Sequence, residues 1–363
     1  GGVVTATSYA GSGANLTNLP ASGATSINGL SDATVYNTTT IGLGSGALDS
    51  MSSGNGRNTA VGYNALTANT SGYNNTAVGH LAGTAITDGY QNTLLGDRTG
   101  TALTTGDNNT ALGQHALKSA TTADGNTAVG FDCMAGNTSG ANNTAIGIYA
   151  LDAVNTGDSN IAIGHTAMTS NTSGHESVAI GRSAMYNNTT GADNVAVGYS
   201  AMDANTTGAS NVAVGHSALK GNTTAQSNVA IGFYALNSNT SGGSNTAIGR
   251  RALNSNTTAS YNTAIGRNAL YTNTGEKNTA IGYYALNSNQ SAANNTAVGY
   301  AALDANTSGS YNTAMGQDSL GLNTTGQQNN AYGRESMMKN TTGSYNTGLG
   351  NQALQANTTA SNS

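Results

Sequence analysis

Apolar residues recur along this chain in short groups separated by longer polar stretches, and a glycine marks each group. The motif Asn-Thr-Ala-Val-Gly, with Ile or Leu replacing Val in several copies, repeats every 17 residues, apart from one interval of 16 before Gly282. About 19 copies occupy the chain. A fixed period of this kind is typical of a solenoid, in which each repeat stacks on its neighbours. The glycines that mark it are Gly62, Gly79, Gly96, Gly113, Gly130, Gly147, Gly164, Gly181, Gly198, Gly215, Gly232, Gly249, Gly266, Gly282, Gly299, Gly316, Gly333 and Gly350.

Each repeat unit begins with a predicted strand, Thr59–Val61 in the first regular copy. β-Branched residues favour extended backbone, and side chains alternate between the two faces of a strand. We expect Val61 and its equivalents to point into the coil together with the Leu66-type residues, and Ala60 to point to the opposite face. Gly62 allows a bend that a side chain would obstruct, and Asn, Ser and Gly further on favour a turn. Seventeen residues suffice for two short strands and two turns, which make one coil of a narrow solenoid.

Stacked units predict an all-β fold: a parallel β-solenoid or β-roll of about 19 coils from about Thr40 to Thr359. No 3.6-residue period persists, which argues against helices. Asparagines in the columns that include Asn58 and Asn171 are expected to hydrogen-bond along the axis. We expect residues 1–40 to form an N-terminal linker or cap and residues 41–363 to form the repeat shaft, roughly 90 Å long at about 4.8 Å per coil.

Alanine occupies the position two before the repeat glycine in nearly every copy, and Leu94 and Gly348 are the clear departures. Because Val61 is assigned to the interior, this Ala60-type column is expected on the outer face. An outer face in contact with solvent would vary over so many copies, so its constancy suggests that another backbone approaches closely. We expect a second copy of the chain there, most simply in a symmetric homotrimer. The alternative is a second layer of the same coil.

Composition excludes several functional classes. Charged residues make up 7% of the chain, where an ordinary soluble domain carries about 25%. The net charge of −5 offers no basic surface, so nucleic acid is not an expected partner. One cysteine excludes an internal disulfide framework. No apolar run reaches the length of a membrane-spanning helix, so no membrane insertion is expected.

Residues that carry chemistry follow the repeat and form no recognisable constellation. Cys133 replaces the recurring alanine of Ala116 and Ala150, so we expect a small buried side chain there. Calcium-loop spacing, phosphate-binding glycine patterns and nucleophile–histidine sets are absent from the sequence. We therefore predict no catalytic, cofactor-binding or metal-ligating residue, no cofactor and no enzymatic activity. The positions interpreted as variable surface or turn residues are His80, His115, His165, His175, His216, Asp107, Asp124, Asp158 and Asp193.

Tyrosine and arginine are the residues best suited to contact a partner. Exposed tyrosine stacks on sugars and makes other adhesive contacts, although scattered surface tyrosine is also common. Arg250 and Arg251 form a small charge cluster. The copies differ most just after the repeat glycine, as at Tyr63, and in the turn near Tyr73, so a receptor or glycan contact is expected on these edges. Other tyrosines at such positions are Tyr199, Tyr261, Tyr283, Tyr300, Tyr311 and Tyr345.

Two family resemblances accompany these patterns. The strings Ser177–Ala184 and Asn211–Ala218, each built on Val-Ala-Ile/Val-Gly, resemble the head repeat of trimeric autotransporter adhesins. That resemblance implies a left-handed parallel β-roll with three chains per head. The segments Gly1–Pro20 and Leu30–Ala33, leading into the repeats, are similar to tail-fibre proteins of marine bacteriophages. This second resemblance covers nearly the whole chain and implies a fibrous homotrimer, in many members followed by a self-cleaving chaperone domain.

The primary hypothesis is a structural fibre, the shaft or adhesive segment of a phage tail fibre or similar appendage, located on the virion or at a cell surface. One alternative is the head of a bacterial trimeric autotransporter-like adhesin. Another is an ice-binding solenoid, because Thr and Ala ladders make a flat, regular face. The change of the Thr59 column to valine, from Val178 to Val229, weakens that last alternative.

Overall fold

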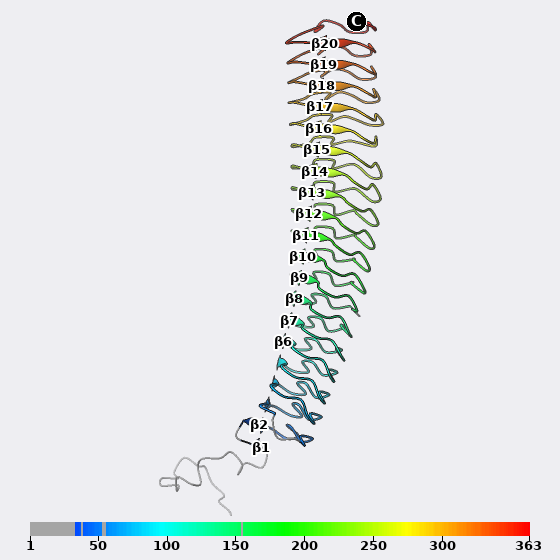
Figure 1. Cartoon of the computed structure of the whole chain (residues 1–363). Coiled ribbons are helices and arrows are strands. Elements are labelled where there is room, and N and C mark those ends of the chain that lie inside the picture. Colours follow the sequence, from blue (N-terminus) through cyan, green and yellow to red (C-terminus); the bar gives the residue numbers. More distant parts are fainter. Residues whose placement is uncertain (1–32, 38, 53–55, 154) are drawn as a thin grey trace, which may run out of the picture.

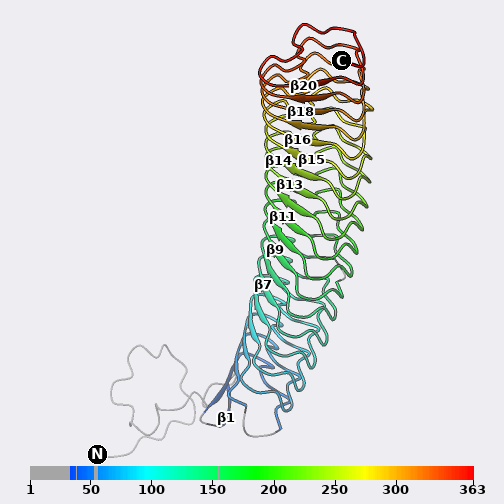
Figure 2. The same ribbon diagram turned by 45° about the horizontal axis from the view of Figure 1, so that its top comes forward.

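The computed structural model describes residues 33–37, 39–52, 56–153 and 155–363, which wind into one parallel β-solenoid (Figure 1). Each coil contributes one short strand, and the strands stack into a single sheet along a gently curved rod (Figures 1 and 2). The described residues contain no helix. The predicted all-β solenoid with a 17-residue coil is confirmed. Residues 1–32, which include most of the predicted N-terminal linker and the segment Gly1–Pro20, lie outside the described residues.

Twenty strands form the sheet, and all except β1 and β2 have three residues. They are β1 Ala33–Asn37, β2 Thr40–Leu43, β3 Thr59–Val61, β4 Thr76–Val78, β5 Thr93–Leu95, β6 Thr110–Leu112, β7 Thr127–Val129, β8 Thr144–Ile146, β9 Ile161–Ile163, β10 Val178–Ile180, β11 Val195–Val197, β12 Val212–Val214, β13 Val229–Ile231, β14 Thr246–Ile248, β15 Thr263–Ile265, β16 Thr279–Ile281, β17 Thr296–Val298, β18 Thr313–Met315, β19 Asn330–Tyr332 and β20 Thr347–Leu349.

Strand register follows directly from the sequence period. From β2 to β20 each strand pairs in parallel with the next, whereas β1 is antiparallel to β2. Val212 pairs with Val229 and Ala213 with Ala230, one coil apart. Identical positions of successive repeats therefore stack into columns.

The rest of each coil differs from the prediction, because the segment around the Leu66-type residue is a turn and not a second strand. Leu219 adopts left-handed backbone with φ 52°, as do its equivalents. Coil-to-coil hydrogen bonding nevertheless continues there, since the Leu219 N–H donates to Ala235 O (2.9 Å) and the Thr223 N–H to Thr240 O (3.1 Å). The left-handed residue folds the chain back sharply and keeps the coil narrow.

The predicted orientation of the strand is wrong. Ala213 and the other Ala60-type residues are fully buried in the coil of their own chain, where they lie in one core cluster with the Leu66-type column. The Val61-type residues point outward instead, as at Ile231, which is 38% exposed. The physical reason is width: the narrow interior accommodates a methyl group from the strand, and the leucine or methionine opposite fills the remaining volume. The alanine column is thus not the contact between chains.

One substitution in the alanine column, and the glycines that accompany it, support the conclusion that this column faces the core. Where Leu94 enters the alanine column, glycine replaces the Leu66-type residue both in the same repeat, at Gly100, and in the preceding one, at Gly83. A Cβ added at Gly83 would lie 2.9 Å from Leu94 Cδ1, and one at Gly100 would lie 3.1 Å from the same atom. The two columns therefore compete for the same space, as facing walls of a packed core do.

Two columns of buried asparagine line the interior and form the predicted ladders. In the first, the Asn228 N–H donates to Asn211 Oδ1 (2.9 Å), and Asn211 Nδ2 donates to the turn carbonyl of Ala225 (2.9 Å). In the second, Asn188 Nδ2 donates to Asn171 Oδ1 (3.0 Å). Each amide thus links two coils and closes a turn, which satisfies polar groups that water does not reach.

Candidate interaction surfaces

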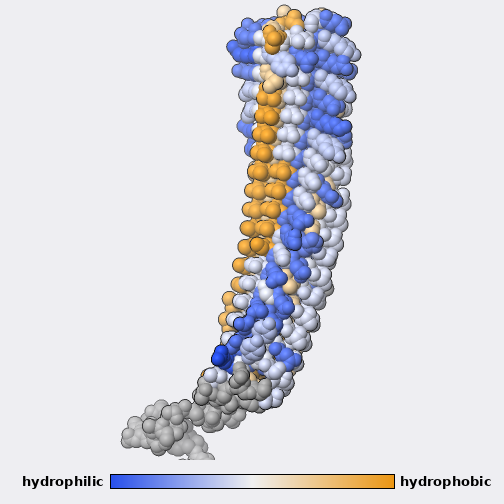
Figure 3. Space-filling view, in the orientation of Figure 1, coloured by the Kyte–Doolittle hydropathy of each residue, from blue (hydrophilic) through white to orange (hydrophobic). Residues whose placement is uncertain are grey.

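The outer face of the sheet carries an uncharged band with a column of aliphatic side chains beside a column that is mostly threonine, and we call this band the aliphatic stripe. It consists of the first and third residues of strands β3 to β20, such as Val212 and Val214. Figure 3 shows it as a hydrophobic band along the rod. Its two columns contain Thr, Val, Ile, Leu, Met, one Asn and one Tyr, and no charged residue. Typical exposures are 43% at Leu112, 40% at Ile146 and 42% at Met315. The stripe is therefore the surface of this rod that is least suited to solvent.

A second surface is formed by the residues that directly follow the repeat glycine. In the coils that begin with strands β10 to β17, numbered coils 10 to 17 after their strands, this position holds only aromatic or cationic side chains. We call these residues the edge column. Its members stack along the axis: Tyr199 on His216 with ring centroids 5.0 Å apart, and Tyr283 on Tyr300 at 5.4 Å. Arg182 lies over the Tyr199 ring, 5.9 Å from its centroid. The members are Arg182, Tyr199, His216, Phe233, Arg250, Arg267, Tyr283 and Tyr300.

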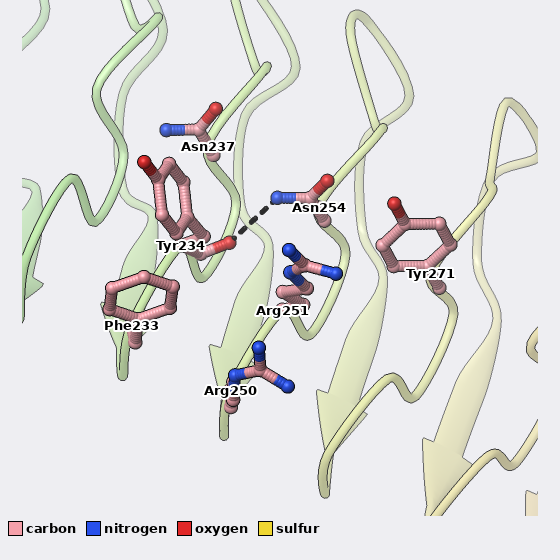
Figure 4. A pocket seen from close by; sticks show the side chains of 7 residues that line it. All are labelled: Phe233, Tyr234, Asn237, Arg250, Arg251, Asn254 and Tyr271. Carbon is pink, nitrogen blue, oxygen red and sulfur yellow. Dashed lines mark hydrogen bonds between the residues drawn. The ribbon is translucent and has the colours of Figure 1, made fainter.

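The edge column borders a pocket of about 440 Å³ near its centre (Figure 4). Phe233, Tyr234, Asn237, Arg250, Arg251, Asn254 and Tyr271 line this pocket. These residues come from three successive coils, and Figure 4 shows the two guanidinium groups between the Phe233–Tyr234 pair on one side and the Tyr271 ring on the other. Residues up to 38 positions apart in the sequence thus share one site only because the coils stack.

Most of the histidines and aspartates lie at surface or turn positions, as predicted. His115 differs, because its side chain is only 20% exposed and its Nε2 is buried without a hydrogen-bond partner. Asp107 Oδ1 accepts the Tyr90 N–H (2.8 Å), and Asp124 Oδ1 accepts the Asp107 N–H (2.7 Å), so these carboxylates cap the turn of the preceding coil. His80 Nδ1 lies 2.7 Å from Asp97 Oδ1, and this hydrogen bond lowers the pKa of the Asp97 carboxyl. Both side chains are well exposed. The pair therefore resembles a solvated surface contact and not a catalytic dyad.

Cys133 is the free cysteine of the described residues, and it is buried as predicted for a substitute of the recurring alanine. Burial raises the pKa of its thiol to about 12, so the nucleophilic thiolate is scarce at neutral pH. Its Sγ–H donates to Ala145 O (3.2 Å). Within the described ranges, no three His, Cys, Asp or Glu side chains lie close enough together to hold a metal ion.

Comparison with known proteins assigns no family: neither a protein-family description nor a curated protein matches this chain. Within the described part of the chain, no helix is long and apolar enough to span a membrane. The β-solenoid repeat fold is compatible with a fibrous or structural shaft.

Proposed function

We propose that this chain is the structural shaft of a fibrous surface appendage, assembled as a homotrimer through the aliphatic stripe. The observation that carries the proposal is the stripe itself, an uncharged surface whose third-residue column is apolar along the rod from β3 to β20. Monomeric proteins rarely expose a contiguous apolar patch larger than a few hundred Å². A partner that covers this one must be as long as the rod.

A second copy of the chain meets that requirement. At about 4.8 Å per coil and a width of about 10 Å, the stripe covers on the order of 800 Å² per chain. Two such surfaces bury roughly 1,600 Å² together, which is the size of a stable protein interface. Two copies also share the same coil spacing, so their side chains interdigitate along the full length without losing register. A threefold arrangement lets all three stripes face a common axis.

Solution mass tests the assembly. We expect light scattering of the purified protein to give three times the 36.0 kDa chain mass. The double variant Val197→Asp/Ile231→Asp places charges on two outward-facing residues of the stripe, Val197 half-buried and Ile231 exposed, and should give monomers with an unchanged β-sheet circular dichroism spectrum. Asp substitution at the exposed Thr240 and Thr257, on another side of the coil, is the matched control and should leave the trimer intact. A native protein of monomer mass contradicts the proposal.

The appendage itself is tested by imaging. Labelled antibody against the chain should mark thin fibres on virions or cells of the source. A tail fibre and an autotransporter-like adhesin head both satisfy that result, and the particle that carries the label distinguishes them. Label confined to the cytoplasm contradicts both.

Ice binding is the second candidate, because the structure places the Thr59 and Val61 columns side by side on one outward face. Regular threonine–aliphatic rows are a surface that ordered water can match. Covering the stripe by trimer formation removes this possibility, so the two functions make opposite predictions. Thermal hysteresis from a monomeric protein favours ice binding, and its absence from a trimer favours the shaft.

A further inference from the structure

We infer that the pocket beside the edge column binds an acidic carbohydrate, with Arg250 and Arg251 holding its carboxylate and Tyr234 and Tyr271 flanking its ring. This inference rests on the proposed surface-presenting role only for its biological setting. The contacts and charges that support it all belong to the pocket and the edge column beside it.

The first step is the positive charge at the pocket. Arg250, Arg251 and Arg267 lie in two adjacent coils, and the three ion pairs of the described residues, at His80, His115 and Arg334, involve none of them. A bound anion would offset the mutual repulsion of these like charges. Positions one and two after the repeat glycine carry no carboxylate from coil 10 to coil 17, so the chain does not supply that anion there.

The second step is the direction of the hydrogen-bonding groups. Asn237 Nδ2 donates to Ser217 O (3.0 Å), and Asn254 Nδ2 donates to Tyr234 O (3.0 Å), as the dashed line in Figure 4 shows for Asn254. Both amide nitrogens are therefore fixed on the backbone. Within the described chain, no group donates to the Oδ1 atom of either residue, so two acceptors remain at the pocket rim for hydroxyl groups of a ligand.

The third step is the apolar surface. Arg250 lies over the Phe233 ring, 5.7 Å from the centroid, which covers one face of Phe233 and holds the guanidinium in place. Phe233 and Tyr234 meet edge to face with centroids 4.3 Å apart. The Tyr234 and Tyr271 rings line opposite sides of the pocket (Figure 4). Aromatic walls of this kind accept the C–H face of a sugar ring.

A ligand that satisfies all three features has an apolar ring face, several hydroxyl donors and a carboxylate. Acidic sugars combine these groups, and the planar guanidinium pairs with a carboxylate in two parallel hydrogen bonds. Single-stranded nucleic acid suits the site less well. It requires a basic groove that follows the backbone, whereas here the cations are local and the chain has a net charge of −5.

Isothermal titration calorimetry with trigalacturonic acid as the probe tests the inference. We expect the native protein to bind trigalacturonic acid, and to bind neutral maltotriose and an oligothymidylate at least about tenfold more weakly, since an ion-paired carboxylate is a major part of the interaction. Arg250→Gln/Arg251→Gln should lower the affinity for trigalacturonic acid by about tenfold or more. Arg182→Gln, in the same column but four coils away, is the matched control and should change it less than about twofold.

The outcomes separate this site from the proposed shaft. Equal binding of maltotriose, tighter binding of the oligothymidylate, absence of binding by the native protein, or full binding by the double variant would each overturn the carbohydrate site. None of these results affects the solution mass or the fibres seen by imaging. None of the three substituted arginines, Arg182, Arg250 and Arg251, is buried. An unchanged thermal melt of each variant therefore establishes that a loss of binding is not a loss of fold.

Discussion

Each buried residue of this protein stabilises the fold through its contacts with equivalent residues of the neighbouring coils. Asn211 Oδ1 accepts hydrogen bonds from the N–H and from Nδ2 of Asn228, while its own Nδ2 donates to Ala225 O and to Asn194 Oδ1. The loss of this amide therefore leaves the Asn228 N–H without an acceptor and removes one of the two donors to the Ala225 carbonyl, the other being Asn222 Nδ2. Each of these groups is buried, so water does not replace the missing partner.

Asn211→Ala is expected to destabilise the rod by about 1–3 kcal/mol, because the Asn228 N–H loses its acceptor while the Ala225 carbonyl keeps only the Asn222 Nδ2 donor. Asn211→Ser is the matched control. In the native chain Ser177 takes an asparagine position, and its Oγ accepts the Asn194 N–H (3.1 Å). The serine variant should therefore lose about half as much stability. Denaturant unfolding followed by circular dichroism measures both, and equal losses would show that the ladder hydrogen bonds contribute little.

The two faces of a strand also differ at the residue scale. Ala213 is fully buried, whereas its neighbour Val214 lies on the outer face and is half-buried. Ala213→Asp should destabilise the coil severely, by about 3 kcal/mol or more, because it buries an unpaired carboxylate. Val214→Asp should leave the thermal melt of the isolated chain nearly unchanged. The opposite ranking would mean that valine, and not alanine, fills the interior.

The second asparagine column is interrupted over three successive coils, and this interruption leaves side-chain atoms without hydrogen-bond partners. Ile86, Leu103 and Ala120 replace the second asparagine column over three coils. Asn69 and Asn137 border this gap. Both side-chain polar atoms of Asn69 lack a hydrogen-bond partner, and so does the side-chain oxygen of Asn137. The same coils contain Leu94 and its compensating glycines, so an apolar repacking of the core replaces the amide ladder there.

The element that repeats is the coil, and the glycine after each strand limits how closely coils stack. At Gly215 the backbone has φ 134°, and an added Cβ would lie 2.7 Å from Gly232 O in the next coil. The same contact recurs along the rod up to Gly333. Gly350 has a similar φ of 121°, but a Cβ there would meet nothing within 4 Å in the described chain.

Gly215→Ala and Gly350→Ala therefore form a matched pair. Both impose left-handed strain on an alanine, which costs about 1–3 kcal/mol, and only Gly215→Ala also pushes two coils apart. We expect the melting temperature to fall substantially more for Gly215→Ala. Thermal unfolding of the two variants measures the difference, and equal shifts would mean that backbone strain alone requires the glycine.

On the scale of the whole molecule, each coil contacts its two neighbours, and every coil is nearly equivalent. Stability should then be a sum of coil and nearest-neighbour contributions. The 16-residue interval before Gly282 shows that one turn residue can be lost without disturbing the stack, since β15 and β16 keep full parallel register. A rod of this kind tolerates a change of length provided that the columns stay aligned.

Deletion of residues 199–215 removes one complete coil and joins Gly198 to His216. We expect the variant to remain a solenoid about 5 Å shorter, with a melting temperature within a few degrees of the native protein. Deletion of residues 199–206 removes half a coil, misaligns every column and should expose that region to proteolysis. Small-angle scattering and limited proteolysis compare the two. Equal tolerance of both deletions would contradict a core built from aligned columns.

The sequence by itself determined the coil. A period of 17 residues requires that equivalent residues stack, so the parallel register, the asparagine ladders, the bend at the repeat glycine and the burial of Leu66-type residues and Cys133 all followed from the pattern. These features depend on local backbone geometry and on the repeat period, and both can be read directly from the linear sequence. The sequence indicated only part of the proposed pocket. It showed the charge cluster at Arg250 and Arg251 and the variable aromatic positions after the repeat glycine.

Only the tertiary structure decided which face of the strand is inside. Alternation separates Val61 from Ala60 but does not say which of them points inward, because that depends on the distance to the opposite wall of the coil. The left-handed turn at the Leu66-type residues makes that distance short, so the methyl group of alanine faces the core and the branched side chains form the outer stripe. The sequence does contain a sign of this orientation, because Leu94 in the alanine column is accompanied by glycine at positions 83 and 100. That sign can be interpreted only once the fold shows that these residues, 11 and 6 positions from Leu94, face the same interior.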